Sequence, residues 1–396
     1  MDLSQARREL ARGDRNGWGV GPLYAGVDEA AAARLGTRRS DAKPAAEDDA
    51  FQAAARERLQ QALSRALGAR LLIERVERLP GGAVHAHWAV VARLGKSGAR
   101  RDVVLRAPHG AQLAISHPPE VEHAVIQAAG EAGVAAPRSY GPVDPPEADG
   151  PRLLALQRIA GRADPPSILA LDDDAGDRLA RQVGGTLARL HALRPAVRPI
   201  PPLGSPPEDA ARARIAELRA GLDALGAVRP ALEWGLVWLA QRADDLPRGP
   251  VCLCHRDYRT ANFMIEPDGA LQAVLDWEFA TWSDAAEDIG WLSAVCWRFE
   301  RRDRACGGFG SMAALLAGYR AAGGAEMTPA RLGFWRVYAL IRWAVIALQQ
   351  GARFDPDDPD TLDCGVTPWR LAELETEILR RTPAGGALAQ TLEADP

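Results

Sequence analysis

Two short polar stretches, each beside an apolar segment, carry the residues best suited to chemistry. His255-Arg256-Asp257 follows the apolar run Val251–Cys254, and Asn262 comes shortly after it. Asp276-Trp277-Glu278 follows the apolar run 271–275. Strand, polar loop, strand, turn and strand can bring two carboxylates and an amide to one point. Phosphoryl transfer uses this set: one Asp faces the acceptor hydroxyl, and an Asn and an Asp bind magnesium.

Each of these residues has an expected role. We expect Asp257 to accept a hydrogen bond from the acceptor hydroxyl, align it and take its proton late. Asn262 and Asp276 offer hard oxygen ligands that suit magnesium. Glu278 lies on the face of Asp276 if the strand continues, where it would reach a second ion or hold a ligand water. His255 is expected to brace the loop backbone. An Asp and an Asn that merely cap turns are the alternative, but the flanking apolar strands favour a site.

The composition is that of an ordinary soluble globular protein. The chain has 396 residues, of which 47% are hydrophobic and 25% charged, and its net charge is -4. This length suggests two to three domain-sized units, or one large two-lobed domain. No apolar run approaches the roughly 20 residues of a membrane span, and the charged N-terminus is unlike a secretory signal. We therefore expect a cytoplasmic monomer or homodimer that binds neither nucleic acid nor membranes.

Five cysteines are present, and their spacing is irregular. Cys252 and Cys254 form C-x-C within an apolar run, so that in a strand they face the same side. This spacing favours buried thiols in a reducing cytoplasm over a zinc or redox site. The other three are Cys296, Cys306 and Cys364.

Hydrophobic periodicity predicts a small mixed unit over residues 49–160. A helix is expected from about Phe51 to Leu67, and another over 118–132. Strands are expected at 71–78, after the turn Gly81-Gly82, at 102–106 and at 153–159. Residues 1–48 are polar and contain a linker-like stretch, and we interpret them as a partly flexible extension.

After Gly161 the pattern becomes helical, with one strand-rich insertion at 251–277. Residues 161–385 are predicted to form a second lobe, followed by a flexible tail at 386–396. Helices are expected at about 173–193, 208–223, 229–243, 283–299, 311–322, 329–351 and 367–381.

At this point the sequence resembles a known family. His-x-Asp-x-x-x-x-Asn at 255–262, followed by an apolar run into Asp276-Trp277-Glu278, resembles the aminoglycoside phosphotransferase and choline kinase group. With Asp284-Ala285-Ala286-Glu287-Asp288, the match is similar to a branch that includes kinase domains fused to acyl-CoA dehydrogenases. The resemblance covers about residues 55–350. It implies an α+β, two-lobed protein-kinase-like fold, with a small antiparallel-sheet N-lobe and a mostly helical C-lobe.

The same resemblance implies a nucleotide site in the small lobe. Gly81-Gly82 resembles the glycine turn over the phosphates, with a plain hairpin turn as the alternative. Arg106 lies where kinases have the phosphate-binding Lys. The planar guanidinium of Arg106 would replace the compact ammonium charge of that Lys. Glu122 matches the helix Glu that pairs with this cation, or else lies on a solvated helix face. Backbone groups near Gln157 and Ile159 match the adenine-binding hinge.

The implied activity is transfer of the γ-phosphate of ATP, with Mg²⁺, to a hydroxyl of a small molecule; GTP is not excluded. The alternative is a nucleotide-binding pseudokinase that acts as a regulatory module. Asp284 is expected as a helix N-cap, with Asp288 tying the loop to that helix. The acceptor stays open, because an Arg-rich stretch at 298–304 suits an anion and an Asp-rich stretch at 355–363 suits a cation. Five aromatic residues have two interpretations: they line the walls of the acceptor pocket, or they pack in the core between helices. These residues are Trp291, Trp297, Trp335, Tyr338 and Trp343.

Overall fold

A computed structural model describes residues 48–79, 85–95, 97–108, 113, 115–146, 150–299, 301, 303–357 and 361–384. Residues 1–47 of the predicted extension, the turn Gly81-Gly82 and the predicted tail 386–396 lie outside these ranges. Predictions about those segments are therefore not addressed by the structure.

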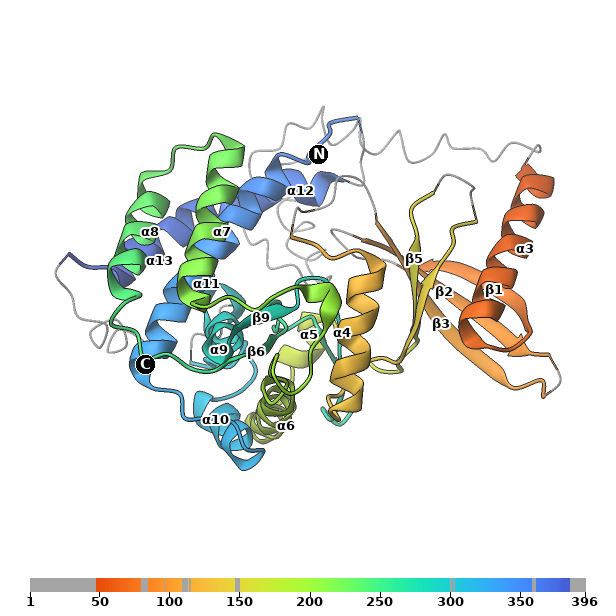
Figure 1. Cartoon of the computed structure of the whole chain (residues 1–396), viewed down its shortest axis with the longest axis horizontal. Coiled ribbons are helices and arrows are strands. Elements are labelled where there is room, and N and C mark those ends of the chain that lie inside the picture. Colours follow the sequence, from red (N-terminus) through yellow and green to blue (C-terminus); the bar gives the residue numbers. More distant parts are fainter. Residues whose placement is uncertain are drawn as a thin grey trace, which may run out of the picture.

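The N-terminal part is an antiparallel sheet of five strands with the order β1-β2-β3-β5-β4 (Figure 1). Alternating side chains of its strands turn inward, among them Val90 and Ala92 of one strand and Val103 and Leu105 of the next. Helix α3 adds Leu59 and Leu63 to this core. The elements are α3 (Asp48–Leu67), β1 (Leu71–Leu79), β2 (His85–Leu94), β3 (Arg100–Pro108), α4 (Pro119–Glu131), β4 (Ser139–Val143) and β5 (Leu153–Gln157).

The sequence did not predict strand β4. It is short and contains Gly141 and Pro142, both of which disfavour a strand interior. It lies at the edge of the sheet, where a missing backbone N–H is tolerated. It lies between α4 and β5, in a stretch of the chain for which the hydrophobic periodicity predicted no element.

The C-terminal part is mostly helical and has its own core, separate from that of the sheet. The long helix α11 is buried along most of its length, and α10 packs against α6. In Figure 1 these helices occupy the left of the view and the sheet the right. The helices are α5 (Pro165–Leu169), α6 (Asp173–His191), α7 (Ala210–Leu225), α8 (Pro230–Arg242), α9 (Ala285–Ser293), α10 (Met312–Ala321), α11 (Pro329–Gly351), α12 (Leu362–Val366) and α13 (Leu371–Arg381).

Helix α4 links the two parts. It follows β3 in the chain, yet its Val125 and Ile126 belong to the core of the helical part. The predicted boundary at residue 160 stays a prediction, because the two parts share this helix. None of the helices in the described ranges is long and apolar enough to span a bilayer.

Two small ladders within the helical part hold the polar stretches. β6 (Val251–Cys254) pairs with β9 (Thr281–Asp284), and β7 (Phe263–Ile265) pairs with β8 (Leu271–Val274). The strand does not continue to Asp276 and Glu278: β8 ends at Val274, and Asp276 has a φ of 69° that no strand adopts. The helix predicted at 283–299 is also shorter, and ends at Ser293.

Candidate active site

The loop between β6 and β7 holds Asp257 in a network of donors. The Asn262 side-chain amide donates to Asp257 Oδ2 at 2.7 Å and to the Asp257 carbonyl oxygen at 2.8 Å. Asp257 Oδ1 accepts from Arg259 Nε at 2.9 Å and from Trp291 Nε1 at 3.1 Å. Because the amide nitrogen of Asn262 is used twice, its oxygen is directed away from Asp257. The loop thus fixes one carboxylate and one amide oxygen side by side.

Asp288 of α9 anchors this loop from behind. Its two carboxylate oxygens accept the backbone N–H groups of His255 at 2.8 Å and Arg256 at 2.6 Å. Asp284 caps the same helix by accepting from Ala286 N at 2.8 Å. Both expectations for these acids are confirmed: one caps the helix and the other ties the loop to it.

His255 braces the backbone, as predicted. Its Nε2 donates to the Leu275 carbonyl at 3.0 Å, and its Nδ1 accepts from Asp257 N at 3.2 Å. Burial keeps the ring neutral by lowering the pKa of His255. Since Leu275 N also donates to the Asn262 carbonyl at 2.8 Å, the residue before Asp276 is fastened to the loop.

Asp276 and Glu278 form ion pairs with Arg106 of β3 in the sheet. Arg106 NH2 lies 2.6 Å from Asp276 Oδ1 and 3.1 Å from Glu278 Oε1, while NH1 pairs with Glu122 Oε1 of α4. The interpretation of Glu122 as a solvated residue is therefore wrong: the side chain is buried and paired. His85 of β2, which the sequence analysis did not single out, accepts from Arg106 NH2 through Nδ1 at 3.0 Å.

Three carboxylates around one guanidinium leave this cluster short of positive charge. Burial, followed by the nearby Asp276, raises the pKa of Glu278 to about 8. Burial and Arg106 lower the pKa of His85 to about 3, so the imidazole supplies no charge. The Glu278 Oε2 atom is buried, and the Ser116 hydroxyl is the neighbouring donor that acts to lower the pKa of Glu278. The cluster is therefore suited to bind a further cation.

Unusual backbone conformations occur in and beside the loop that holds Asp257. Among the described residues, the non-glycine positions with positive φ are Arg256 (65°), Ala261 (86°), Asp276 (69°) and Phe299 (47°). The first three lie in or beside the loop network. Such conformations cost of order 1–3 kcal/mol each and persist where surrounding contacts impose them, commonly at functional sites.

Comparison with known protein families identifies the family of the chain. The model of the phosphotransferase enzyme family matches residues 75–335. The chain belongs to the phosphotransferase enzyme family. Membership makes it a small-molecule kinase, that is, a phosphotransferase with an alcohol group as acceptor. No curated protein matches the chain by sequence.

Solved structures show that this phosphotransferase has the kinase-like fold that was expected. A candidate aminoglycoside phosphotransferase from Ralstonia eutropha is 20% identical with a TM-score of 0.59, and the match covers 83% of this chain and 98% of that one. APH(2″)-IIIa with GDP and kanamycin is 16% identical, with a TM-score of 0.54 and coverages of 81% and 97%. Plasmodium vivax ethanolamine kinase is 14% identical, with a TM-score of 0.54 and coverages of 91% and 98%.

In this phosphotransferase the segment after β5 connects the sheet to the loop network. Gln157 N donates to the Arg138 carbonyl at 2.8 Å, so that amide is already used. Ile159 lies half-buried two residues further on. Arg162 and Ile265 then exchange two backbone hydrogen bonds, of 2.9 and 2.8 Å. At Gly161 (φ 131°) a Cβ would come within 2.5 Å of the Ile265 carbonyl oxygen, so a glycine is needed there.

The aromatic residues of the phosphotransferase divide into two groups. Trp291, Trp297 and Trp343 form a row with ring centroids 5.2 and 4.8 Å apart, and Trp291 reaches Asp257. Trp335 and Tyr338 instead pack on each other at 5.1 Å within the core. The helix-core interpretation is thus correct for Trp335 and Tyr338, and also for Trp291 and Trp297, which are buried in the same core. Trp291 and Tyr338 in addition contact the loop, through Asp257 and Arg256.

The Arg-rich stretch is not a simple surface run, whereas Asp355, Asp357 and Asp363 of the Asp-rich stretch are exposed. Arg298 is buried and donates through NH2 to the Ser293 carbonyl at 2.9 Å, and Arg304 pairs with Asp173 and Asp177 of α6. These two arginines hold the segment after α9 in place. Arg342, which the sequence analysis did not single out, lies with its guanidinium carbon 4.4 Å from the Trp291 ring centroid.

Proposed function

We propose that this protein transfers the γ-phosphoryl group of ATP to a hydroxyl of a small molecule in a Mg²⁺-dependent reaction. The observation that carries the proposal is the convergence of Asp257, Asn262 and Asp276. Asn262 bonds Asp257 directly, and Leu275, the residue before Asp276, bonds both Asn262 and His255. In this proposal residues 49–160 bind the nucleotide and residues 161–385 bind the acceptor.

Asp257 is the group that we assign to the acceptor hydroxyl. A carboxylate offers about four lone-pair positions, and Arg259, Trp291 and Asn262 occupy three of them. The position that is left accepts the hydroxyl, and the three donors fix its direction. Asp257 then aligns the hydroxyl for in-line attack and takes its proton late.

The donor set fits Mg²⁺. We assign the metal to the Asn262 amide oxygen and to the Asp276 carboxylate, whose side chain is 34% exposed. The buried Oε2 of Glu278 supplies a further oxygen for an ion or its water. Bound there, Mg²⁺ would neutralise charge on the phosphates. In the absence of nucleotide, Arg106 contributes by holding Asp276 in place from the sheet side.

The nucleotide side rests on fewer described contacts. We assign Arg106 to the phosphates and Glu122 to its support, since this pair joins β3 to α4. Gly81-Gly82 is proposed to cover the phosphates, and the backbone near Gln157 and Ile159 to receive the base. Because the Gln157 N–H is bound to Arg138, its carbonyl and the Ile159 backbone are the groups that we expect to contact the base.

One observation favours the pseudokinase alternative. Arg106 is paired with three carboxylates, so phosphate binding must compete with Glu122, Asp276 and Glu278 for the guanidinium. A pseudokinase would bind nucleotide without turnover. The intact Asp257–Asn262 pair favours the enzyme.

The test combines binding with turnover. Thermal shifts are measured with ATP and GTP, each with and without Mg²⁺, because APH(2″)-IIIa is known in complex with GDP. Release of ADP or GDP is then measured over a panel of acceptor hydroxyls: aminoglycosides, macrolides and hydroxyacyl-CoA esters. We expect a Mg²⁺-dependent shift and turnover of one acceptor class. Nucleotide binding without turnover of any acceptor would support the pseudokinase, and no shift with either nucleotide would refute both.

A further inference from the structure

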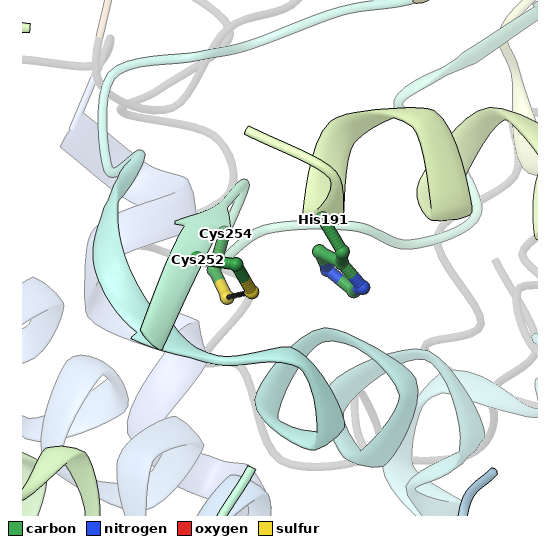
Figure 2. Close-up of side chains that lie close together, drawn as sticks. All are labelled: His191, Cys252 and Cys254. Carbon is green, nitrogen blue, oxygen red and sulfur yellow. Dashed lines mark hydrogen bonds between the residues drawn. The ribbon is translucent and has the colours of Figure 1, made fainter. Parts of the chain in front are cut away.

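Three potential metal ligands lie close together beside Asp288, which binds the loop. They are His191 at the end of α6 and Cys252 and Cys254 of β6, all three buried. One ligand atom from each lies within 4.8 Å of the other two. Figure 2 shows both sulfur atoms on one side of the strand, with the His191 ring beside them. None of these residues takes part in the proposed phosphoryl transfer.

The sulfur separation fits a tetrahedral metal ion. The two Sγ atoms are 3.8 Å apart. With metal–sulfur bonds of about 2.3 Å and tetrahedral angles, two thiolate ligands lie about 3.8 Å apart. The corresponding sulfur–nitrogen separation is about 3.6 Å. Since the ligand atoms lie within 4.8 Å of one another, the imidazole needs to approach the thiols by at most about 1.2 Å.

The hydrogen bonds of His191 already have the arrangement of a metal-binding histidine. Its Nε2 donates to Asp288 Oδ2 at 3.1 Å, and its Nδ1 accepts from the Tyr319 hydroxyl at 2.9 Å. A ligating histidine commonly donates its other N–H to a carboxylate, which fixes the tautomer and makes the ligand more basic. Only the Tyr319 hydroxyl has to give up its bond to free the Nδ1 lone pair.

Charge selects the kind of ion. Two thiolates and a neutral imidazole balance a divalent cation, so the ion and its three ligands together carry no net charge in a buried region. Sulfur ligands favour thiophilic ions such as Zn²⁺ over Mg²⁺. A cavity of about 270 Å³ lined by His191, Cys252, Tyr319 and Arg331 adjoins the site. It provides an entry path and room for a water as fourth ligand.

We propose that His191, Cys252 and Cys254 form a binding site for one thiophilic divalent cation, Zn²⁺, with Asp288 as the partner of the ligating histidine. Binding replaces two S–H bonds with two metal–sulfur bonds, and the two protons leave to solvent. Asp288 also accepts the backbone N–H groups of His255 and Arg256. Occupancy is therefore coupled to the loop that carries Asp257, through one shared carboxylate.

The experiment uses the full chain, freed of metal with a chelator under reducing conditions. Cobalt(II) serves as a spectroscopic probe for the zinc site, and zinc affinity is measured by competition with a chromophoric chelator. We expect about one ion per chain, thiolate-to-cobalt charge-transfer absorption with tetrahedral visible bands, and release of about two protons per ion. Absence of the charge-transfer absorption from the folded protein would overturn the proposal, whatever ions bind at the oxygen ligands.

Variants locate the site. Cys252→Ser and Cys254→Ser are each expected to lower zinc affinity by at least about 100-fold, since loss even of an outer-shell partner costs 10–100-fold. Cys364→Ser, which changes a buried cysteine of α12, is the matched control and should bind as the unaltered chain does. Binding that survives both substitutions, or that is lost equally in the control, contradicts the assignment. Should a variant fail to fold, proton release from the unaltered chain still decides the matter.

The coupling to the loop has its own measurement. Hydrogen exchange of the His255 and Arg256 amides is followed with and without zinc, at constant pH and without nucleotide. Zinc should slow exchange at both amides, because the metal-bound imidazole fixes the Asp288 carboxylate that accepts them. Unchanged exchange at both positions in the loaded protein would refute the link while leaving the metal site in place.

Discussion

Arg106 NH2 lies 2.6 Å from Asp276 Oδ1, so a cation of the sheet neutralises a carboxylate of the loop region across the two parts of the molecule. Arg106 also pairs with Glu122 and Glu278, and its side chain is 3% exposed. Three carboxyl groups from α4 and the segment after β8 thus depend on one guanidinium of β3. Its replacement should affect both stability and nucleotide binding.

We predict that Arg106→Met destabilises the protein by about 3–5 kcal/mol, because it leaves buried carboxylates without a partner. Arg106→Lys keeps the positive charge but contacts fewer carboxylates at once. It should therefore lower the free energy of unfolding clearly less than Arg106→Met does. Urea unfolding of both variants at pH 7 gives the comparison. Equal losses for Met and Lys would show that packing, and not charge, is what Arg106 provides.

Asp257→Asn should lower turnover of the identified acceptor at least about 100-fold, because the amide cannot take the proton of the hydroxyl. Nucleotide affinity should change only a few-fold, since the role that we propose for Asp257 is at the acceptor hydroxyl and not at the phosphates. Steady-state kinetics and calorimetry measure the two effects. Asp268→Asn, an exposed Asp in the turn between β7 and β8, is the control. Turnover within a few-fold of the unaltered enzyme would disprove the role given to Asp257.

Glu217 of α7 predicts a pH dependence of stability. It pairs with Arg256 of the loop and with Arg214, and these charges outweigh burial and lower the pKa of Glu217 from 4.5 to about 2. A carboxyl whose folded pKa is depressed stabilises the protein above pH 4.5, and this contribution disappears as the pH falls through 2. The shift corresponds to stabilisation on the order of 3 kcal/mol.

Glu217→Gln should therefore destabilise the protein at pH 7 and flatten its loss of stability between pH 4.5 and 2. Denaturant unfolding across this range measures both effects. The control is Glu233→Gln, which changes an exposed ion pair with Arg219 and should alter stability by at most about 0.5 kcal/mol. A Glu217→Gln profile parallel to that of the unaltered protein would rule out the proposed linkage.

Two neighbouring glycines of α6 offer a matched packing test. A Cβ on Gly184 would lie 2.1 Å from the Leu315 carbonyl oxygen of α10, whereas one on Gly185 would have no neighbour closer than 3.7 Å. Gly184→Ala should thus destabilise by about 2–3 kcal/mol or more, because backbone atoms must move. Gly185→Ala should be neutral or stabilise by up to about 1 kcal/mol through helix propensity. Thermal melting distinguishes the two, and the reverse order would mean that α6 and α10 pack differently.

Much of the site could be predicted from sequence because its residues are close along the chain. Asp257, Asn262 and Asp276 fall between short apolar strands, and alternation with turn residues makes such strands recognisable. The end of β8 was not predicted correctly, because nothing in Leu275-Asp276 indicates a left-handed backbone conformation at Asp276. Only the surrounding contacts impose that conformation. β4 was missed because an edge strand tolerates the Gly and Pro that argue against it.

The sequence by itself indicated the long helices, most strands, the polar motifs of the loop and the family, since these depend on local periodicity and motif spacing. It did not indicate the short helices α5 and α12. Only the tertiary structure decided which distant groups meet. His85 joins Arg106 through the register of β2 against β3, and Trp291 reaches Asp257 from the following helix. His191 reaches Cys252 and Cys254 because α6 packs against β6. The C-x-C spacing alone favoured buried thiols without a metal. The third proposed ligand, His191, is distant in sequence, so no local sequence motif connects it to the two cysteines.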